Sequence, residues 1–111
     1  MEHYDVVVYK TAEADMQGII NYISTELLES KTAYNTAQRF REAILSLSNM
    51  PERYALLADK HLTSLGIRAC SLGNYLIFYT VDKTGHQVNI LRVLHGRRNW
   101  EQLLNSPNSF L

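Results

Sequence analysis

The chain has 111 residues and a formal net charge of zero, because eleven lysine and arginine residues balance eleven aspartate and glutamate residues. Proteins that wrap long nucleic acids carry a basic excess, so this balance predicts no extensive nucleic-acid surface. The length predicts one domain over residues 1–111, and the single cysteine, Cys70, excludes an internal disulfide and fits a cytoplasmic location. No segment approaches the roughly 20 apolar residues that span a bilayer, which predicts no membrane contact.

The first half of the chain predicts one strand and two helices. Residues 3–9 are rich in β-branched and aromatic side chains and predict the strand. Residues 12–28 carry apolar side chains at helical spacing, with Thr11 as the expected N-cap. A second amphipathic helix follows Ser30 and ends before Pro51, and the short connection between the two helices predicts an antiparallel pair.

The second half of the chain predicts a β-meander that follows a long loop. Residues 51–66 show no sustained period and are expected to form the loop. The later elements expected are strands over residues 67–72, 75–81 and 87–95, a short helix over 98–104 and a loose tail over 105–111. The order β-α-α-β-β-β, with an antiparallel helix hairpin on a mainly antiparallel four-stranded sheet, predicts an α+β fold.

The pairing of the last three strands assigns side chains to the two faces of the sheet. Across the Gly73-Asn74 turn Leu72 is expected opposite Tyr75, and in the next hairpin Val81 is expected opposite His86. One face then carries Arg68, Cys70, Leu72, Tyr75, Ile77, Tyr79, Ile90, Arg92 and Leu94, and the other carries Ile67, Ala69, Leu76, Phe78, Leu91, Val93 and His95. Neither face is polar, and two helices cover only one. The second face is therefore predicted to be a partner interface, unless the tail and the long loop cover it.

Four segments together resemble the RelE/ParE family of bacterial type II toxins: TAEADMQGIINYI, LSNMPERYALL, GIRACSLGNYLIFYTVD and ILRVLHGRR. The resemblance runs through nearly the whole chain in the family's order. It implies the β-α-α-β-β-β fold, a cytoplasmic bacterial protein and a neutralising antitoxin that lays an extended or helical segment over the toxin. Such a partner suits the uncovered apolar face, so the expected antitoxin-binding residues are Leu76, Phe78, Leu91 and Val93.

The resemblance implies one of two targets. RelE-like toxins cut messenger RNA in the ribosome, whereas ParE-like toxins inhibit DNA gyrase. RelE-like cleavage uses two strand lysines, a strand arginine, a late arginine and a tail tyrosine. When the chain is compared with this RelE-like pattern without gaps, starting from Tyr75, only the late arginine is present, at Arg97 or Arg98. The other positions hold uncharged side chains: Ile67, Ala69, Leu76 and Leu104. The segment RVLHGRRNW resembles the ParE pattern, so a ParE-like toxin is favoured.

The predicted site lies where the last strand ends. Arg97, Arg98 and Trp100 are expected to bind the target, DNA gyrase. In the alternative, a ribosome-dependent endonuclease acting on messenger RNA, His95 and Arg98 would be catalytic and His61 would assist. A third interpretation is a degenerate toxin that only binds its antitoxin. No cofactor is expected, and no metal either, because the histidines lack metal-site spacing.

Overall fold

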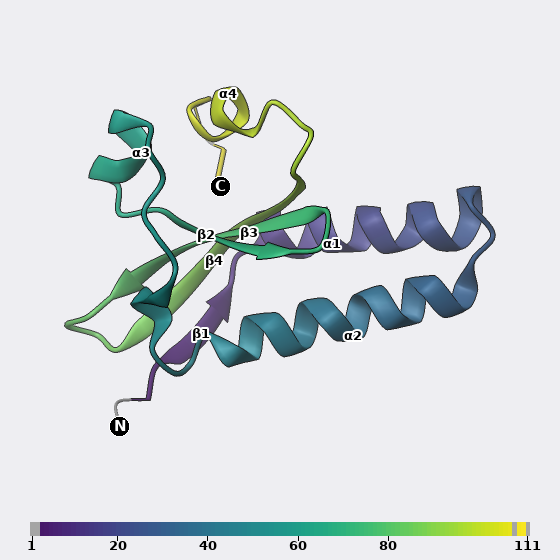
Figure 1. Cartoon of the computed structure of the whole chain (residues 1–111), viewed down its shortest axis with the longest axis horizontal. Helices are drawn as coiled ribbons and strands as arrows, with labels where there is room; N and C mark the ends of the chain where they lie inside the picture. Colours follow the sequence, from purple (N-terminus) through teal and green to yellow (C-terminus); the bar gives the residue numbers. More distant parts are fainter. Residues whose placement is uncertain (1–2, 108, 111) are drawn as a thin grey trace.

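The computed structural model describes residues 3–107 and 109–110, whose elements follow the predicted order (Figure 1). The strands are β1 (Asp5–Val8), β2 (Arg68–Leu72), β3 (Tyr75–Asp82) and β4 (Gln87–His95). The helices are α1 (Lys10–Asn21), α2 (Ser30–Ser46), α3 (Lys60–Ser64) and α4 (Trp100–Leu104). A π-helical turn over Tyr22–Glu26 follows α1, and a 3₁₀ turn over Pro51–Arg53 follows α2. No helix within the described ranges is long and apolar enough to cross a membrane.

The four strands form one mixed sheet in the order β1-β4-β3-β2. β1 runs parallel to β4, and the other two pairings are antiparallel. The predicted α+β fold with a mainly antiparallel sheet is therefore confirmed. The β2–β3 hairpin has the predicted register, with Leu72 opposite Tyr75. Gly73 permits this tight turn, because its φ of 58° lies in the left-handed region that a side chain with a Cβ disfavours.

Helices α1 and α2 cover one face of the sheet and extend beyond its edge as a helical hairpin (Figure 1). The apolar side chains that the helical and strand periods predicted fill the core beneath them. The largest side chains that are fully buried in it are Phe40 of α2 and Tyr79 of β3. The Tyr79 hydroxyl also donates a hydrogen bond to the carbonyl oxygen of Pro51 at 2.6 Å. This bond ties the segment after α2 to the middle of the sheet.

The other face of the sheet is covered by α3, α4 and the C-terminal segment. Leu62 of α3 and Leu104 of α4 are buried against Phe78, and Trp100 and Phe110 pack at the margin of this second core. The prediction of an open apolar face is therefore wrong, because the long loop and the C-terminal segment of the same chain cover it. The predicted loose tail falls partly on residues 108 and 111, which lie outside the described residues.

A β-bulge in β4 changes the face that the four residues after it, Arg92 to His95, occupy. The register between β3 and β4 shifts at Phe78 and Tyr79, where Leu91 is the extra residue. One extra residue reverses the alternation of faces beyond it. Val93 therefore packs in the core under α1 and α2, and Leu94 turns to the opposite face, which corrects the prediction for both residues.

The first helix ends earlier than predicted. α1 stops at Asn21, and the π-helical turn replaces its expected last turns. The hydroxyls of Ser24 and Thr25 both donate to the Asn21 carbonyl oxygen, at 3.2 and 2.6 Å. Side-chain hydroxyls that compete for a helix carbonyl oxygen disturb regular α-helical geometry. Leu28 then turns the chain toward α2 with a φ of 54°.

Replacing Tyr79 with Phe tests the buried hydrogen bond. Burial raises the pKa of Tyr79 to about 12, whereas an unfolded tyrosine ionises near pH 10, roughly its ordinary pKa. The stability that the neutral phenol contributes is therefore present below about pH 10 and is lost as the pH rises toward about 12. In urea denaturation at about pH 8, Tyr79→Phe should lower the free energy of unfolding by about 1 kcal/mol. The difference in the free energy of unfolding between wild type and Tyr79→Phe should become smaller above about pH 10.

Tyr22→Phe provides the matched control, because Tyr22 is exposed. Its free energy of unfolding should stay within about 0.5 kcal/mol of wild type across the same pH range. A Tyr79→Phe difference that does not change with pH would contradict the role of the buried phenol.

Candidate functional site

Helix α1 is anchored to the outer edge of β4, beside the predicted site. β1 pairs only with the first half of β4, so the second half of this edge has no strand partner among the described residues. The Thr11 hydroxyl donates to the Leu91 carbonyl oxygen at 2.7 Å, and the Asp15 carboxylate accepts from the Val93 backbone N–H at 3.0 Å. Two side chains of α1 thus supply hydrogen bonds that a strand would have made. The sequence predicted Thr11 as the N-cap of this helix. Thr11 instead lies inside α1 and bonds to β4.

The same carboxylate binds Arg92. Arg92 Nε and Nη2 donate to the two oxygens of Asp15 at 2.6 and 2.8 Å, and Nη1 donates to the Ser109 carbonyl oxygen at 3.2 Å. Both side chains are largely buried, at 13% and 11% exposure. The hydrogen bond to Asp15 raises the pKa of Arg92 above its ordinary value, which favours the charged form. Arg92 therefore joins α1, β4 and the C-terminal segment at one point.

His95 ends β4 and begins the turn that carries the predicted site. It pairs with Tyr75 of β3, and the two rings meet edge to face with centroids 5.6 Å apart. The Arg97 backbone N–H donates to His95 Nδ1 at 3.1 Å, so the neutral imidazole carries its proton on Nε2. The Gly96 N–H donates to the Asn74 carbonyl oxygen at 2.8 Å. The turn after β4 is thereby held against the β2–β3 turn.

The four residues predicted for the site are only partly brought together. Arg97 and Arg98 are exposed next to His95, and their guanidinium groups have no acceptor within residues 3–107 and 109–110. Trp100 turns away from them, because its ring packs 5.3 Å from the ring of Phe78. The two arginines thus form a cationic end of β4 beside the imidazole, and Trp100 packs against Phe78.

His61, the second histidine considered for catalysis, lies at another place. It belongs to α3 and lines a hollow of about 330 Å³ against the C-terminal segment, which His95 does not line. The described residues place no carboxylate in hydrogen-bonding contact with His95. They also contain no group of three His, Cys, Asp or Glu side chains that could hold a metal ion. General acid–base cleavage requires an acid and a base beside the phosphate, and this arrangement presents one imidazole with two cations.

The four residues predicted to bind antitoxin are largely inaccessible. Phe78, Leu91 and Val93 are at most 4% exposed, and Leu76 is half-buried in the second core. Val93 also lies on the helix-covered face, as a consequence of the bulge. The prediction depended on an open sheet face, and α3 and the C-terminal segment fill that space.

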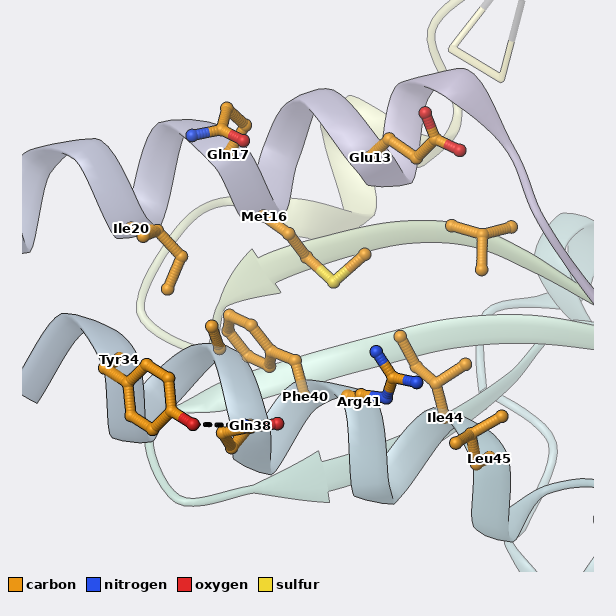
Figure 2. Close-up of a pocket in the computed structure, with 12 residues that line it drawn as sticks. Glu13, Met16, Gln17, Ile20, Tyr34, Gln38, Phe40, Arg41, Ile44 and Leu45 are labelled. Carbon is orange, nitrogen blue, oxygen red and sulfur yellow. Dashed lines mark hydrogen bonds between the residues drawn. The ribbon is translucent and has the colours of Figure 1, made fainter.

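An apolar groove that sequence reasoning missed lies between α1 and α2 (Figure 2). It has a volume of about 690 Å³. Its apolar side chains include Met16 and Ile20 of α1, which point toward Phe40 and Ile44 of α2. Polar side chains also line it: Glu13, Gln17, Gln38 and Arg41. The sequence signal was Ala37, a small residue in the apolar stripe of α2 where a larger side chain would fill the space.

Two further exposed side chains extend the apolar character of this groove. Tyr34 and Leu45 of α2 line it and are 64% and 55% exposed. The Tyr34 hydroxyl accepts a hydrogen bond from the Gln38 amide at 2.9 Å, which holds the ring along the helix (Figure 2). The groove therefore combines an apolar interior with polar side chains, as a docking site for an amphipathic element does.

The fold of the chain, with its helical hairpin, is similar to that of chains from ParDE and RelBE systems. A chain of the chromosomal ParDE system from P. aeruginosa is similar over 86% of this chain and 98% of its own length, with a TM-score of 0.69 and 18% identity. A chain of the RelBE2 toxin–antitoxin complex from Mycobacterium tuberculosis is 26% identical, with a TM-score of 0.61 over 84% of this chain and 98% of that one. A chain of the RelE–RelB complex from Pyrococcus horikoshii OT3 is 20% identical, with a TM-score of 0.56 over 88% and 99%.

The sequence itself assigns the family. The family model of the ParE toxin of type II toxin–antitoxin systems (parDE) matches residues 6–100. The chain therefore belongs to the ParE toxin family. This confirms the resemblance seen in the sequence, including its ParE-like character. No curated protein matches the sequence at a significant level.

Replacing Asp15 with Ala tests the anchor between α1 and β4. The substitution removes the only carboxylate partner of the largely buried Arg92 guanidinium that the described residues supply, together with the acceptor of the Val93 N–H. Breaking such a pair from one side is expected to lower the free energy of unfolding by about 3 kcal/mol. Urea denaturation followed by circular dichroism measures the change.

A double-mutant cycle with Arg92→Leu supplies the control. The double variant should lose less stability than the sum of the two single variants, because it leaves no unpaired buried charge. Strictly additive losses would show that the two side chains are not coupled.

Proposed function

We propose that this toxin arrests growth by binding and inhibiting DNA gyrase, and that a cognate antitoxin neutralises it. The observation that carries the proposal is the pair Arg97 and Arg98, exposed beside a histidine that no carboxylate contacts within the described residues. Such a cationic surface suits the recognition of an acidic partner. Membership of the ParE family supports the same target, since the ParE-like resemblance implies gyrase.

The burial of the sheet face under α3, α4 and the C-terminal segment also supports a binding mechanism. Ile67 is fully buried, and Ala69 and Leu76 are half-buried in the second core. These are the positions at which the resemblance to RelE-like toxins would require cations. An apolar, covered surface does not neutralise a phosphate group.

We assign antitoxin docking to the groove between α1 and α2. Its apolar interior and polar rim fit one face of an amphipathic segment, the recurring mode in which a helix binds a groove. Two of the similar structures are toxin–antitoxin complexes, and the third is a ParDE toxin–antitoxin system. An antitoxin partner is therefore expected for this chain, and the groove offers it an apolar hollow of about 690 Å³.

Cleavage of messenger RNA in the ribosome is the second candidate function. Two observations favour it: the 26% identity with a chain of the RelBE2 complex, and the Nε2 of His95, which faces no hydrogen-bond partner within the described residues. An imidazole nitrogen in this position is open to contact with a substrate group.

A supercoiling assay tests the proposed target. Purified toxin should block the supercoiling of relaxed plasmid by purified gyrase, because the toxin occupies the enzyme. Primer extension on messenger RNA after induction should show no new codon-phased cuts. Full supercoiling at a large molar excess of toxin, together with codon-phased cuts, would instead establish the endonuclease function.

Introducing a charge into the groove tests the antitoxin assignment. Ala37→Glu places a carboxylate among the apolar side chains that line the groove, where desolvation penalises it. Binding of the antitoxin, measured by isothermal titration calorimetry, should weaken by about tenfold or more. Gyrase inhibition should be retained.

Asn35→Glu is the matched control, since Asn35 is exposed on the same helix and does not line the groove. It should bind antitoxin as wild type does. Equal affinity of the Ala37→Glu variant and this control would remove the groove from the antitoxin interface.

A further inference from the structure

A third arginine, Arg39 of α2, lies at the β2–β3 turn, which Gly96, the residue before Arg97, also contacts. Arg39 of α2 reaches over the β2–β3 turn, where a Cβ on Gly73 would lie 3.4 Å from its Nη2 and 3.7 Å from its Nη1. The next residue, Asn74, is hydrogen-bonded through its carbonyl oxygen to the N–H of Gly96. Arg97 and Arg98 follow directly. The Arg39 side chain and the backbone of the turn after β4 thus both contact one hairpin turn.

The arginines of the chain differ in whether other residues supply an acceptor for their guanidinium groups. Arg53 donates to carbonyl oxygens at the end of α2, Arg68 pairs with Glu52, and Arg92 pairs with Asp15. Arg39, Arg97 and Arg98 are exposed, and the described residues give their side chains no acceptor. Arg41, the remaining arginine, lines the groove. The three gathered arginines, which we call the arginine cluster, are therefore available to a partner.

The surroundings of the arginine cluster favour a protein carboxylate over a nucleic-acid backbone. Guanidinium groups bind carboxylates and phosphates with the same two-pronged geometry. Glu42 lies one helical turn along α2 from Arg39, and Glu101 lies in the first turn of α4, close behind Arg98. Acidic residues thus stand close in sequence to Arg39 and Arg98, and the chain as a whole has no basic excess, which binding to a long phosphate backbone would require.

We propose that Arg39, together with Arg97 and Arg98, binds an acidic segment of the toxin's target enzyme. This inference rests on the proposed function and adds a residue and a partner chemistry to it. Arg39 does not line the groove assigned to the antitoxin, so the two surfaces are separable by mutation. The cluster acts as a charged rim, which governs the rate of association and its salt dependence.

The test uses purified gyrase as the probe and the concentration of toxin that halves supercoiling as the readout. Arg39→Gln should raise that concentration about fivefold, and Arg39→Gln/Arg97→Gln/Arg98→Gln should raise it about fiftyfold or more. Added salt should weaken gyrase inhibition by the wild-type toxin more than inhibition by the triple variant. The triple variant lacks the charge–charge attraction that salt screens. Lys31→Gln is the matched control, with the same loss of charge at an exposed position of α2, and it should inhibit as wild type does.

The outcomes separate the two proposals. If wild type inhibits gyrase and Arg39→Gln inhibits equally well, the role of Arg39 is contradicted while the proposed function stands. If wild type does not inhibit gyrase, the proposed function fails and the target-binding role of the cluster fails with it. Unchanged thermal unfolding and unchanged antitoxin binding of the triple variant should exclude misfolding. Salt-dependent binding of a free 20-base-pair DNA duplex, lost in the triple variant, would overturn the assignment to an acidic protein segment.

Discussion

The carboxylate of Asp15 holds together the parts of the toxin that meet at the end of β4. It replaces a missing strand by accepting the Val93 N–H, and it fixes Arg92, which in turn binds the C-terminal segment. Because Val93 lies two residues before His95, this anchor holds α1 close to the end of β4 and to the turn with the exposed arginines. The position of α1, and with it one wall of the groove, depends on the same carboxylate.

The two proposed binding surfaces are connected by a row of aromatic rings. Phe40 lines the groove and lies 5.3 Å from Tyr75, edge to face, and Tyr75 lies 5.6 Å from His95 in the same manner. A segment bound in the groove would thus lie one row of rings away from the arginine cluster. This proximity offers a physical route by which an antitoxin larger than the groove would block the target site.

Periodicity predicted the order of elements and the β2–β3 register, because each depends on neighbouring residues. The bulge at Leu91 has no glycine to mark it, so the faces predicted for the residues beyond it were wrong. The predicted pairing of Val81 with His86 was wrong for a different reason: His86 still belongs to the turn, and Val81 pairs with Val88. His95, Arg97 and Arg98 could be grouped because they are nearly contiguous. Arg39 and the groove could not, since both depend on how α2 lies over the sheet and how far it stands from α1.

Amide hydrogen–deuterium exchange of the toxin, free and in each complex, tests most directly whether it uses two separate surfaces. Antitoxin should slow exchange chiefly in α1 and α2 along the groove. Gyrase should slow exchange chiefly at residues 73–74 and 95–99, around the arginine cluster. If gyrase protected only the groove helices and left both turns unchanged, the account of a separate target-binding surface would be contradicted.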